Sequence, residues 1–261
     1  SSCTNRIDDD CDGLTDCEDP DCQGGTETSC GDGMDNDCDG LTDCEDPDCD
    51  GAACANGVCS GGGCCFGNDG VYQGCVHSGG FEDILSTGTR VLNSDDDYAR
   101  VTLPFTFNLY GRDLTEVTLQ TNGGITEAHA YLQGGSWVLP APVAGSQGLL
   151  AVFWTDIMTG PHTDFGVYHE TRGTPGSRRF IVQWKATYNF KYEEPGIFQA
   201  VLYEGSNTIE FRYHDLYFGN YADFGAESSV GIQSGSAGPF IMFSYKTPSL
   251  RDGMTLRFTR L

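Results

Sequence analysis

An acidic stretch framed by cysteines occurs twice near the start of the chain, and no other feature limits the fold as strongly. It runs from Ile7 to Cys22 as IDDDCDGLTDCEDPDC and from Met34 to Cys49 as MDNDCDGLTDCEDPDC. Four cysteines of the first copy, Cys3, Cys11, Cys17 and Cys22, recur 27 residues later as Cys30, Cys38, Cys44 and Cys49. Self-similarity at a fixed period identifies an internal repeat.

The carboxylates of each copy follow the pattern D-x-D-x-D-G-x-x-D-x-x-D, which is the spacing of a calcium-binding loop. Calcium prefers about six to eight oxygen ligands gathered by a tightly curved backbone, and the glycine provides the turn. The predicted ligands of the first copy are Asp8, Asp10, Asp12, the backbone carbonyl of Leu14, Asp16 and Asp19. Those of the second copy are Asp35, Asp37, Asp39, the carbonyl of Leu41, Asp43 and Asp46. We therefore expect Ca²⁺ as the cofactor, at two similar sites.

Two departures separate these loops from an EF-hand. The twelfth position is Asp rather than a bidentate Glu, and neither copy is flanked by amphipathic helices, so a helix-pair calcium switch is not expected. Over roughly the first fifty residues the stretch resembles thrombospondin type 3 repeats and the Asp/Cys-rich metal-binding repeats of secreted bacterial proteins. The resemblance implies structural calcium in an extracellular protein. The alternative is a solvated acidic linker, against which the duplicated ligand spacing argues.

The negative charge is concentrated in the same part of the chain. Of the formal net charge of −24, residues 1–75 carry −18, because 19 Asp and Glu residues accompany only Arg6 there. A stretch this acidic must bind cations or stay expanded. Since the Lys and Arg clusters that bind phosphates are absent from the sequence, we expect no nucleic-acid partner.

All thirteen cysteines lie between Cys3 and Cys75. A zinc site usually carries C-x-x-C pairs, whereas the gaps within each repeat are seven, five and four residues. Disulfides are therefore favoured over a zinc cluster, and they indicate a secreted, extracellular or cell-surface protein. Because thirteen is odd, at least one cysteine cannot pair within the chain.

The sequence predicts four parts. They are the first repeat with its connector (residues 1–29), the second repeat (30–50), a Gly/Cys-rich disulfide segment (51–80) and a β-sandwich (81–261). Residues 51–80 hold too few apolar side chains for a hydrophobic core, so cross-links should shape them. The expected fold class is mainly β: an irregular arm stabilised by disulfides and calcium, followed by an antiparallel β-sandwich.

Ten segments after residue 98 show the short, turn-bounded runs of β-branched and aromatic residues that are typical of strands. They are Arg100–Leu109, Glu116–Gln120, Leu149–Trp154, Gly166–Glu170, Phe180–Lys185, Phe198–Tyr203, Thr208–Tyr213, Ser229–Gln233, Ile241–Tyr245 and Met254–Thr259. Without a sustained helical period, they predict an antiparallel sandwich. Alternation within Phe180–Lys185 and Thr208–Tyr213 predicts one core-facing side for each strand.

The same strands carry a second resemblance. The motifs are LPFTFNLYG (103–111), NG (122–123), AVFWTDI (151–157), GVYHE (166–170), RRFIVQW (178–184), FQAVLYEGSNTIEFRY (198–213) and VGIQ (230–233). In this order they resemble the strands of nidogen-like extracellular β-sandwich domains over nearly all of residues 81–261. The resemblance implies a non-catalytic surface or matrix module. Glu127 stands where that family usually has an aromatic residue, so the sheet after Asn122 is expected to differ.

The sequence does not favour an enzyme. It contains no G-x-S-x-G elbow, no H-E-x-x-H motif and no P-loop. Its five histidines are scattered: His77, His129, His162, His169 and His214. Those in or beside strands are better explained by structural hydrogen bonds than by catalysis. We therefore predict neither catalytic residues nor an organic cofactor.

A few further residues can be interpreted in two ways. Asp95–Asp97 and Asp156 cap turns or hold another calcium ion, and turn capping is favoured. Phe153, Trp154 and Trp184 are predicted to fill the core. Trp137, in the loop QGGSW, is either a loop anchor or an exposed aromatic that contacts a sugar or a partner.

Two classes of function remain. The first is a calcium-stabilised structural or adhesive protein that associates with copies of itself, head to tail, into a surface fibre or matrix. The second is a secreted carbohydrate-binding module that recognises extracellular glycans, which needs a concave site with aromatic platforms. The sequence favours the first. No run approaches the roughly 20 apolar residues of a membrane span, and the absence of a leader at Ser1 predicts mature, secreted material.

Overall fold

The computed structural model describes residues 3–9, 11–55, 57–143, 148–160, 162–188 and 194–261, and the chain is mainly β in these residues. It divides into two compact units. The first comprises Ser1–Phe66 and Cys75–His77, and the second comprises Gly67–Gly74 and Ser78–Leu261. Within the described residues no helix is long and apolar enough to cross a membrane.

The two acidic repeats of the first unit have the same local structure. Each contains two one-turn 3-10 helices, η1 (Asp16–Glu18) and η2 (Pro20–Cys22) in the first copy and η3 (Asp43–Glu45) and η4 (Pro47–Cys49) in the second. The second helix of each pair begins with proline, whose missing amide hydrogen is not needed at that position. The strands β1 (Ala53–Cys54), β2 (Gly57–Ser60) and β3 (Gly63–Asn68) follow and pair in antiparallel order.

Six disulfides connect the described cysteines. They are Cys3–Cys22, Cys17–Cys38, Cys30–Cys49, Cys44–Cys59, Cys54–Cys64 and Cys65–Cys75. Cys11 is left as an exposed free thiol. The oxidised framework that the cysteine spacing predicts is thereby confirmed. The buried cluster of the first unit consists of half-cystines with Ala52 packed against them, so cross-links replace a conventional apolar core here.

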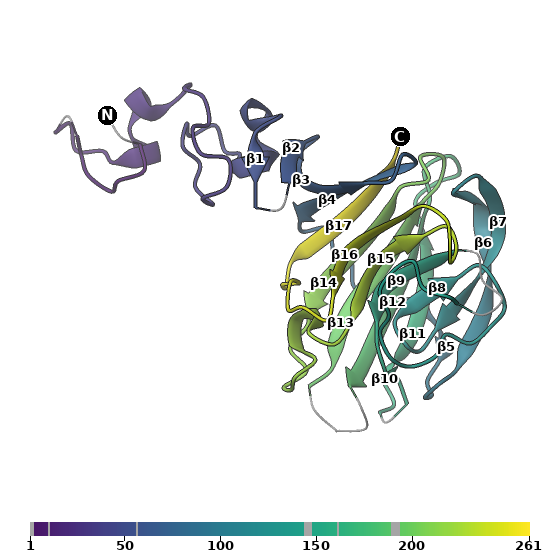
Figure 1. Ribbon diagram of the computed structural model, residues 1–261. Helices are drawn as coiled ribbons and strands as arrows, with labels where there is room; N and C mark the ends of the chain where they lie inside the picture. The colour runs from purple at the N-terminus through teal and green to yellow at the C-terminus, as the bar shows by residue number, and fades with distance from the viewer. Residues whose placement is uncertain (1–2, 10, 56, 144–147, 161, 189–193) are drawn as a thin grey trace. The chain divides into compact units, whose positions relative to one another are not determined.

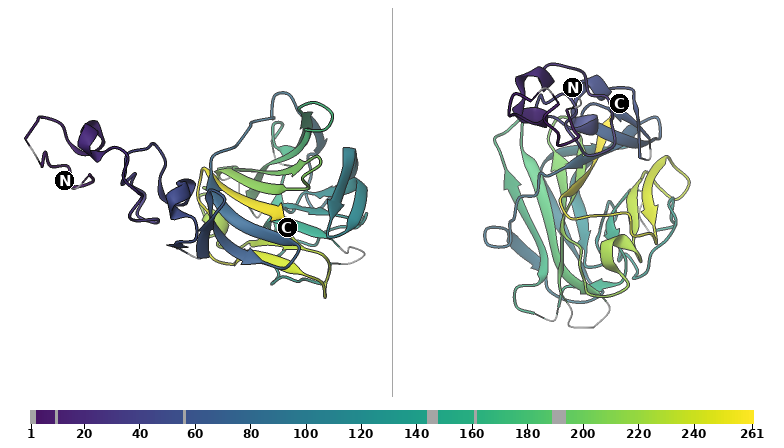
Figure 2. Two further views of the ribbon diagram at one scale, coloured as in Figure 1. Left: turned by 90° about the horizontal axis from the view of Figure 1, so that it is seen from above. Right: turned by 90° about the vertical axis from the view of Figure 1, so that its left-hand side faces the viewer.

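Two antiparallel sheets form most of the second unit (Figures 1 and 2). The six-stranded sheet has the order β16-β15-β9-β8-β7-β6. The other contains β17-β14-β13-β12-β11-β5 in this order, with β10 paired to β12. The bounds are β5 (Thr89–Leu92), β6 (Tyr98–Leu109), β7 (Arg112–Gln120), β8 (Gly124–Thr126), β9 (Leu149–Trp154), β10 (Ile157–Met158), β11 (Gly166–Arg172), β12 (Arg179–Tyr188), β13 (Gly196–Tyr203), β14 (Ile209–Asp215), β15 (Ser229–Gln233), β16 (Phe240–Tyr245) and β17 (Met254–Arg260). β4 (Tyr72–Ser78) precedes them and belongs partly to each unit.

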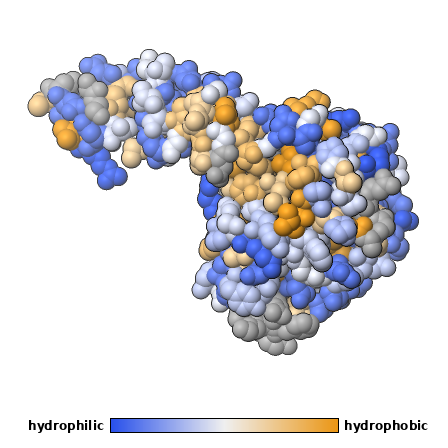
Figure 3. Space-filling model, in the orientation of Figure 1, coloured by the Kyte–Doolittle hydropathy of each residue, from blue (hydrophilic) through white to orange (hydrophobic). Residues whose placement is uncertain are grey.

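The core of the second unit lies between the two sheets. The ring of Phe153 on β9 is 5.2 Å from that of Phe198 on β13, and Trp184 on β12 stacks on Phe198 at 5.3 Å. The indole N–H of Trp184 donates across the sandwich to the carbonyl of Gln120, at 2.8 Å. Phe153, Trp154 and Trp184 are at most 2% exposed, which confirms their predicted place in the core. The face of this unit drawn in Figure 3 is mostly hydrophilic, with separate apolar patches.

The prediction that one face of each strand is core is wrong for β12. Ile181 and Gln183 are 0% exposed although they alternate with residues of the sandwich core. A segment between β4 and β5, residues 81–88, covers this second face. Its Ile84 packs with Ile181 in a small buried cluster, and the Ile84 amide donates to Gln183 Oε1 at 3.0 Å. The covering segment is far away in sequence, so alternation within the strand could not reveal it.

The same correction applies to β14. Its polar residues Glu210 and Arg212 are 3% exposed rather than facing solvent. They form an ion pair of 2.7 Å between Oε2 and Nη2, and Glu82 of the covering segment lies 3.2 Å from Arg212 Nη1. Burial is possible because each charge has an opposite partner.

All ten predicted strands are present, and the mainly β, antiparallel fold class is confirmed. β9 and β15 have the predicted bounds, and β7 begins four residues earlier, at Arg112. β8 ends at Thr126, and the amide of the next residue, Glu127, donates to the Gly148 carbonyl at 3.2 Å. The Glu127 carboxylate pairs with Arg112 at 2.9 Å.

Candidate metal sites

The second acidic repeat is bent into a loop by its own carboxylates. Asp35 Oδ1 accepts the amide of Cys38 at 2.6 Å, and Oδ2 accepts that of Gly40 at 3.0 Å. Asp39 Oδ1 accepts the amide of Leu41 at 2.8 Å. Gly40 has φ +96°, a left-handed conformation that glycine adopts without strain. The D-x-D-x-D-G pattern therefore curls the backbone with side chain to backbone bonds.

Three carboxylates converge inside this curve. Asp37, Asp39 and Asp46 each place an oxygen within 4.8 Å of the others. Asp46 is 3% exposed, and its Oδ1 accepts the amide of Asp48 at 2.7 Å to cap η4. Its Oδ2 is buried and has no hydrogen-bond partner among the described residues. Because like charges repel and an unpaired buried oxygen is costly, this arrangement suits a cation.

A second group of carboxylates shares Asp37. Glu27, Asp35 and Asp37 also lie within 4.8 Å of one another. Glu27 is 7% exposed, and its Oε2 accepts the amide of Asn36 at 2.9 Å. Burial raises the pKa of Asp37, and the charges of Asp39, Asp46 and Asp35 raise it further, against the lowering effect of the Asp39 amide. The sequence pattern did not identify Glu27, which lies in the connector between the two loops.

The first repeat makes most of the corresponding bonds. Asp8 accepts the amides of Asp12 and Gly13 at 3.2 and 2.9 Å, and Asp12 accepts that of Leu14 at 2.9 Å. Asp19 is 4% exposed and caps η2 as Asp46 caps η4. Asp10, the predicted ligand between them, lies outside the described residues. The two loops therefore share the bonds to the glycine and leucine amides and the cap of the second 3-10 helix. They differ at one amide, because that of Asp12 donates to Asp8 whereas that of its counterpart Asp39 donates to Asp37 Oδ1, at 3.3 Å.

The ninth-position aspartates of both loops are engaged with the backbone. Both oxygens of Asp16 lie 3.0 Å from the amide nitrogen of Arg6, and both oxygens of Asp43 lie 3.1 Å from that of Gly33. These bonds tie the start of each repeat to its 3-10 helix. The role of Asp16 and Asp43 as metal ligands stays a prediction, as do those of the Leu14 and Leu41 carbonyls.

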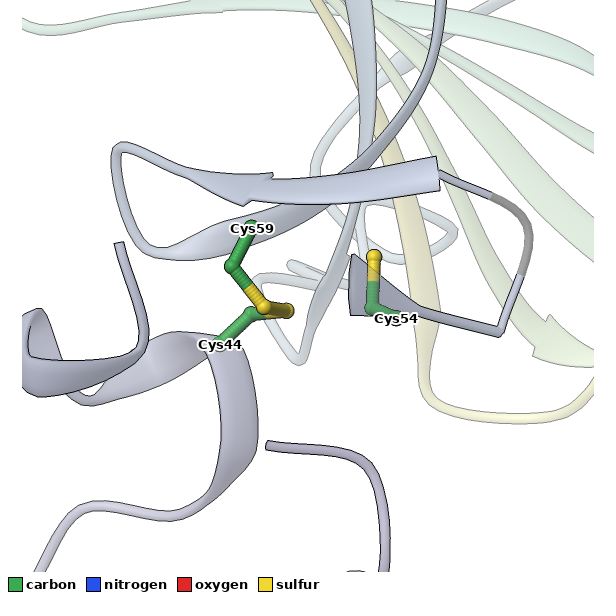
Figure 4. Close-up of side chains that lie close together, drawn as sticks. All are labelled: Cys44, Cys54 and Cys59. Carbon is green, nitrogen blue, oxygen red and sulfur yellow. A yellow bond between two sulfur atoms is a disulfide. The ribbon is translucent and has the colours of Figure 1, made fainter. Parts of the chain in front are cut away.

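The clustered cysteines of this unit are bonded to one another and not poised for zinc. Cys44 and Cys59 form a disulfide beside Cys54 (Figure 4). Cys54 is itself bonded to Cys64. Disulfide sulfurs are not thiolate ligands. The metal candidates of the first unit are therefore its carboxylates, which favour hard cations such as calcium.

A third acidic group lies in the second unit. Asp95, Asp96 and Asp156 place oxygens within 4.8 Å of one another, at the edge of a cavity of about 510 Å³. Burial raises the pKa of Asp95 and of Asp156, and the charge of Asp96 adds to both shifts. The neighbouring Asp97 instead makes turn contacts, since it accepts the Ser94 hydroxyl at 2.9 Å. Tyr131 and Asn122 donate to Asp96 Oδ1.

Trp137 is the exposed one of the three tryptophans, at 49%, although Tyr217 and Tyr221 are more exposed still. Its backbone is held by Ser229, whose hydroxyl accepts the Trp137 amide at 2.8 Å and donates to its carbonyl at 2.6 Å. With Tyr131 and Trp154 it lines a cavity of about 190 Å³. Anchoring through the backbone leaves the indole ring available for contact.

The histidines are placed against aromatic rings or strands. His214 stacks on Phe81 at 4.4 Å, and His169 lies 5.4 Å from Phe180. Burial lowers the pKa of His169. No metal group formed by the described residues includes a histidine.

Fold and sites together define a disulfide-bonded, all-β protein with acidic loops ahead of a two-sheet domain. The model of the family described as NIDO related matches residues 71–259, and the chain belongs to this nidogen-related family. The match covers nearly all of the second unit and confirms the nidogen-like resemblance of its strands. No curated protein and no solved structure matches the chain significantly.

Proposed function

We propose that this protein is a non-catalytic, calcium-binding structural or adhesive protein of the extracellular space. Its nidogen-related domain and its disulfides support the extracellular structural role, because disulfides persist in oxidising compartments. The acidic loops supply the calcium sites. In this proposal calcium stiffens the repeats, since carboxylates held together without a cation repel one another.

The observation that carries the calcium proposal is the unpartnered oxygen of Asp46. It is buried beside the carboxylates of Asp37 and Asp39, which can offer it only further negative charge. A divalent cation among the three would supply the missing partner for Oδ2 and offset the repulsion. Calcium fits better than zinc because the available ligands are oxygens at a loop of calcium-binding spacing.

Isothermal titration with calcium tests this proposal on the whole protein. We expect two similar sites in the parent, one in Asp46→Asn, and none in Asp19→Asn/Asp46→Asn. Asp48→Asn and Asp21→Asn are the matched controls, because these neighbouring aspartates are exposed and removal of their charge should leave both sites intact. Calcium uptake by the double variant equal to that of the parent would show that the ligand assignment is wrong.

We further propose that the protein associates with copies of itself in a surface fibre or matrix. Sheets with unpaired end strands can extend by adding a strand from another molecule. β6 is one end strand of the six-stranded sheet. Its pairing with β7 is broken between Thr102 and Phe107, and Pro104 lies within this break. β16 forms the other end of that sheet and pairs with β15 from Phe240 to Tyr245, with one irregularity between Val230 and Gly231. Because β16 contains no proline, we favour it as the edge for association.

A carbohydrate-binding function is the second candidate, favoured by the exposed indole of Trp137 beside a cavity. Aromatic rings of this kind pack against the apolar faces of sugars. If the protein binds glycans here, Trp137→Ala should abolish binding on a glycan array. Val138→Ala should not, because Val138 is equally exposed but not aromatic. If the parent protein binds no glycan on the array, the carbohydrate-binding function is excluded.

A further inference from the structure

The disulfides that join one repeat to the segment after it follow a regular pattern of loop positions. Cys17 stands at the tenth position of the first loop and bonds to Cys38, at the fourth position of the second loop. Cys44, at the tenth position of the second loop, bonds forward to Cys59 in the next segment. Each tenth-position cysteine thus reaches the segment that follows, and the fourth-position cysteine receives the bond from the repeat before.

Cys11 is the fourth-position cysteine of the first loop and the free thiol of the described chain. Its counterpart Cys38 occupies the same place one period later and is bonded, so the second repeat shows what this position does when a repeat precedes it. Both residues have the same left-handed backbone, with φ of 65° and 63°. Cys11 is exposed, so an incoming thiol can reach it.

The observed pairing of a tenth-position with a fourth-position cysteine identifies the kind of partner. The tenth-position cysteines Cys17 and Cys44 are both used within the chain, and so are all cysteines other than Cys11. A second copy of this chain therefore offers only its own Cys11. We propose that Cys11 is a covalent docking site for the tenth-position cysteine of a further Asp/Cys repeat of this type. The repeat can be supplied by the same polypeptide or by a partner protein.

The bond forms by oxidation of two thiols. Cys11 and the incoming cysteine lose two protons and two electrons, and an exogenous low-molecular-weight disulfide such as glutathione disulfide takes them up and becomes two thiols. The inference stands apart from the proposed calcium function, because it rests on the disulfide pattern alone.

The test extends the full chain by one repeat. A second copy of residues 3–29 is placed directly before Cys3, with the copy's own fourth-position cysteine replaced by serine. The added tenth-position cysteine then precedes Cys11 by 21 residues, the separation found between Cys17 and Cys38. After refolding with glutathione disulfide, bonds are mapped by peptide mass spectrometry, and a cysteine that carries maleimide or glutathione is counted as an unpaired, reactive thiol.

The parent should show one reactive thiol, Cys11, and the extended chain none, with a new bond between Cys11 and the added cysteine. The extended chain with Cys11→Ser should regain one thiol, on the added repeat. Three results would overturn the proposal: a Cys11 that stays reactive in the extended chain, a Cys11 bonded to one of the other twelve cysteines in the parent, or a parent that forms Cys11–Cys11 dimers. A separately refolded peptide of the added repeat is also mixed with the parent. If the peptide forms the bond with Cys11, a partner protein can supply the repeat; if only the extended chain forms it, the same polypeptide is the source.

Discussion

Glu210 and Arg212 show how single residues of β14 shape the second unit. Their side chains are each 4% exposed, yet Glu210 is contacted by Arg212, by Arg257 at 2.7 Å and by the Tyr203 hydroxyl at 2.8 Å. Burial alone raises the pKa of Glu210, but these donors and charges outweigh it and the pKa is lowered. The carboxylate is therefore kept ionised inside the domain. A buried charge of this kind is tolerated only with its partner in place.

Removing one member of this network should be strongly destabilising. We predict that Arg212→Met lowers the free energy of unfolding by about 3–5 kcal/mol, since it leaves Glu210 buried without its main partner. Arg100→Met is the matched control, because Arg100 pairs with Glu116 in a bridge whose side chains are 47% and 43% exposed, and such pairs contribute about 0–1 kcal/mol. Urea unfolding followed by tryptophan fluorescence reports on this unit, which contains Trp137, Trp154 and Trp184. Equal losses in the two variants would refute the prediction.

At the same scale, the sequence predicts part of the candidate metal site. Asp37, Asp39 and Asp46 are brought together as the loop spacing suggests, because the pattern encodes the local turn and its side chain to backbone bonds. Glu27 could not be predicted, since its place beside Asp35 depends on how the connector folds back on the second repeat. No residue pattern within the loop carries that information.

At the scale of elements, the prediction of strands succeeds where a run of β-branched and aromatic residues is long and bounded by turns. β9 and β15 even have the predicted ends. The shorter strands β8 and β10, of three and two residues, carry too little pattern to be recognised. Strands β1 to β4 lie among glycines and cysteines, where disulfides hold the backbone together and the usual alternation is weak. The covered face of β12 depends on the distant residues 81–88, which no local pattern reports.

The covering segment should contribute to stability through Ile84. This residue is 0% exposed and packs with Tyr168, Ile181 and Val201. We predict that Ile84→Ala lowers the free energy of unfolding by about 2–5 kcal/mol, because it leaves a cavity against β12. Val138→Ala, at a side chain that is 53% exposed, should change it by less than about 0.5 kcal/mol. An Ile84 variant as stable as the parent in urea would mean that the segment does not seal this face.

At the scale of the whole molecule, each of the two units is stabilised internally by a different kind of interaction. The first carries most of the negative charge and all six disulfides of the described chain, each typically worth about 2–4 kcal/mol. The second buries aromatic residues between two sheets and needs no cross-link of its own for its core. The first unit therefore depends on oxidation and, in our proposal, on calcium. The second should fold independently of both.

This division allows a test of self-association. If the acidic repeats of one molecule bind the sandwich of the next, a head-to-tail contact that does not close into a ring produces a filament. We predict that the intact, calcium-loaded protein forms long assemblies and that deletion of residues 1–50 leaves a monomer. Because the deletion removes Cys44, the variant also needs Cys59→Ser to avoid a new free thiol. Size-exclusion chromatography with light scattering measures both, and negative-stain microscopy shows the shape of any assembly.

Two controls separate association of the repeats from other causes. Full-length Cys11→Ser should still assemble, because the predicted contact is not covalent, whereas its failure would assign the assemblies to disulfide linkage. Adding a chelator to the intact protein should dissolve the assemblies if calcium stiffens the repeats that make the contact. If the intact, calcium-loaded protein is monomeric at high concentration, the fibre proposal is wrong. The exposed Trp137 and its cavity would then make glycan binding the function to pursue.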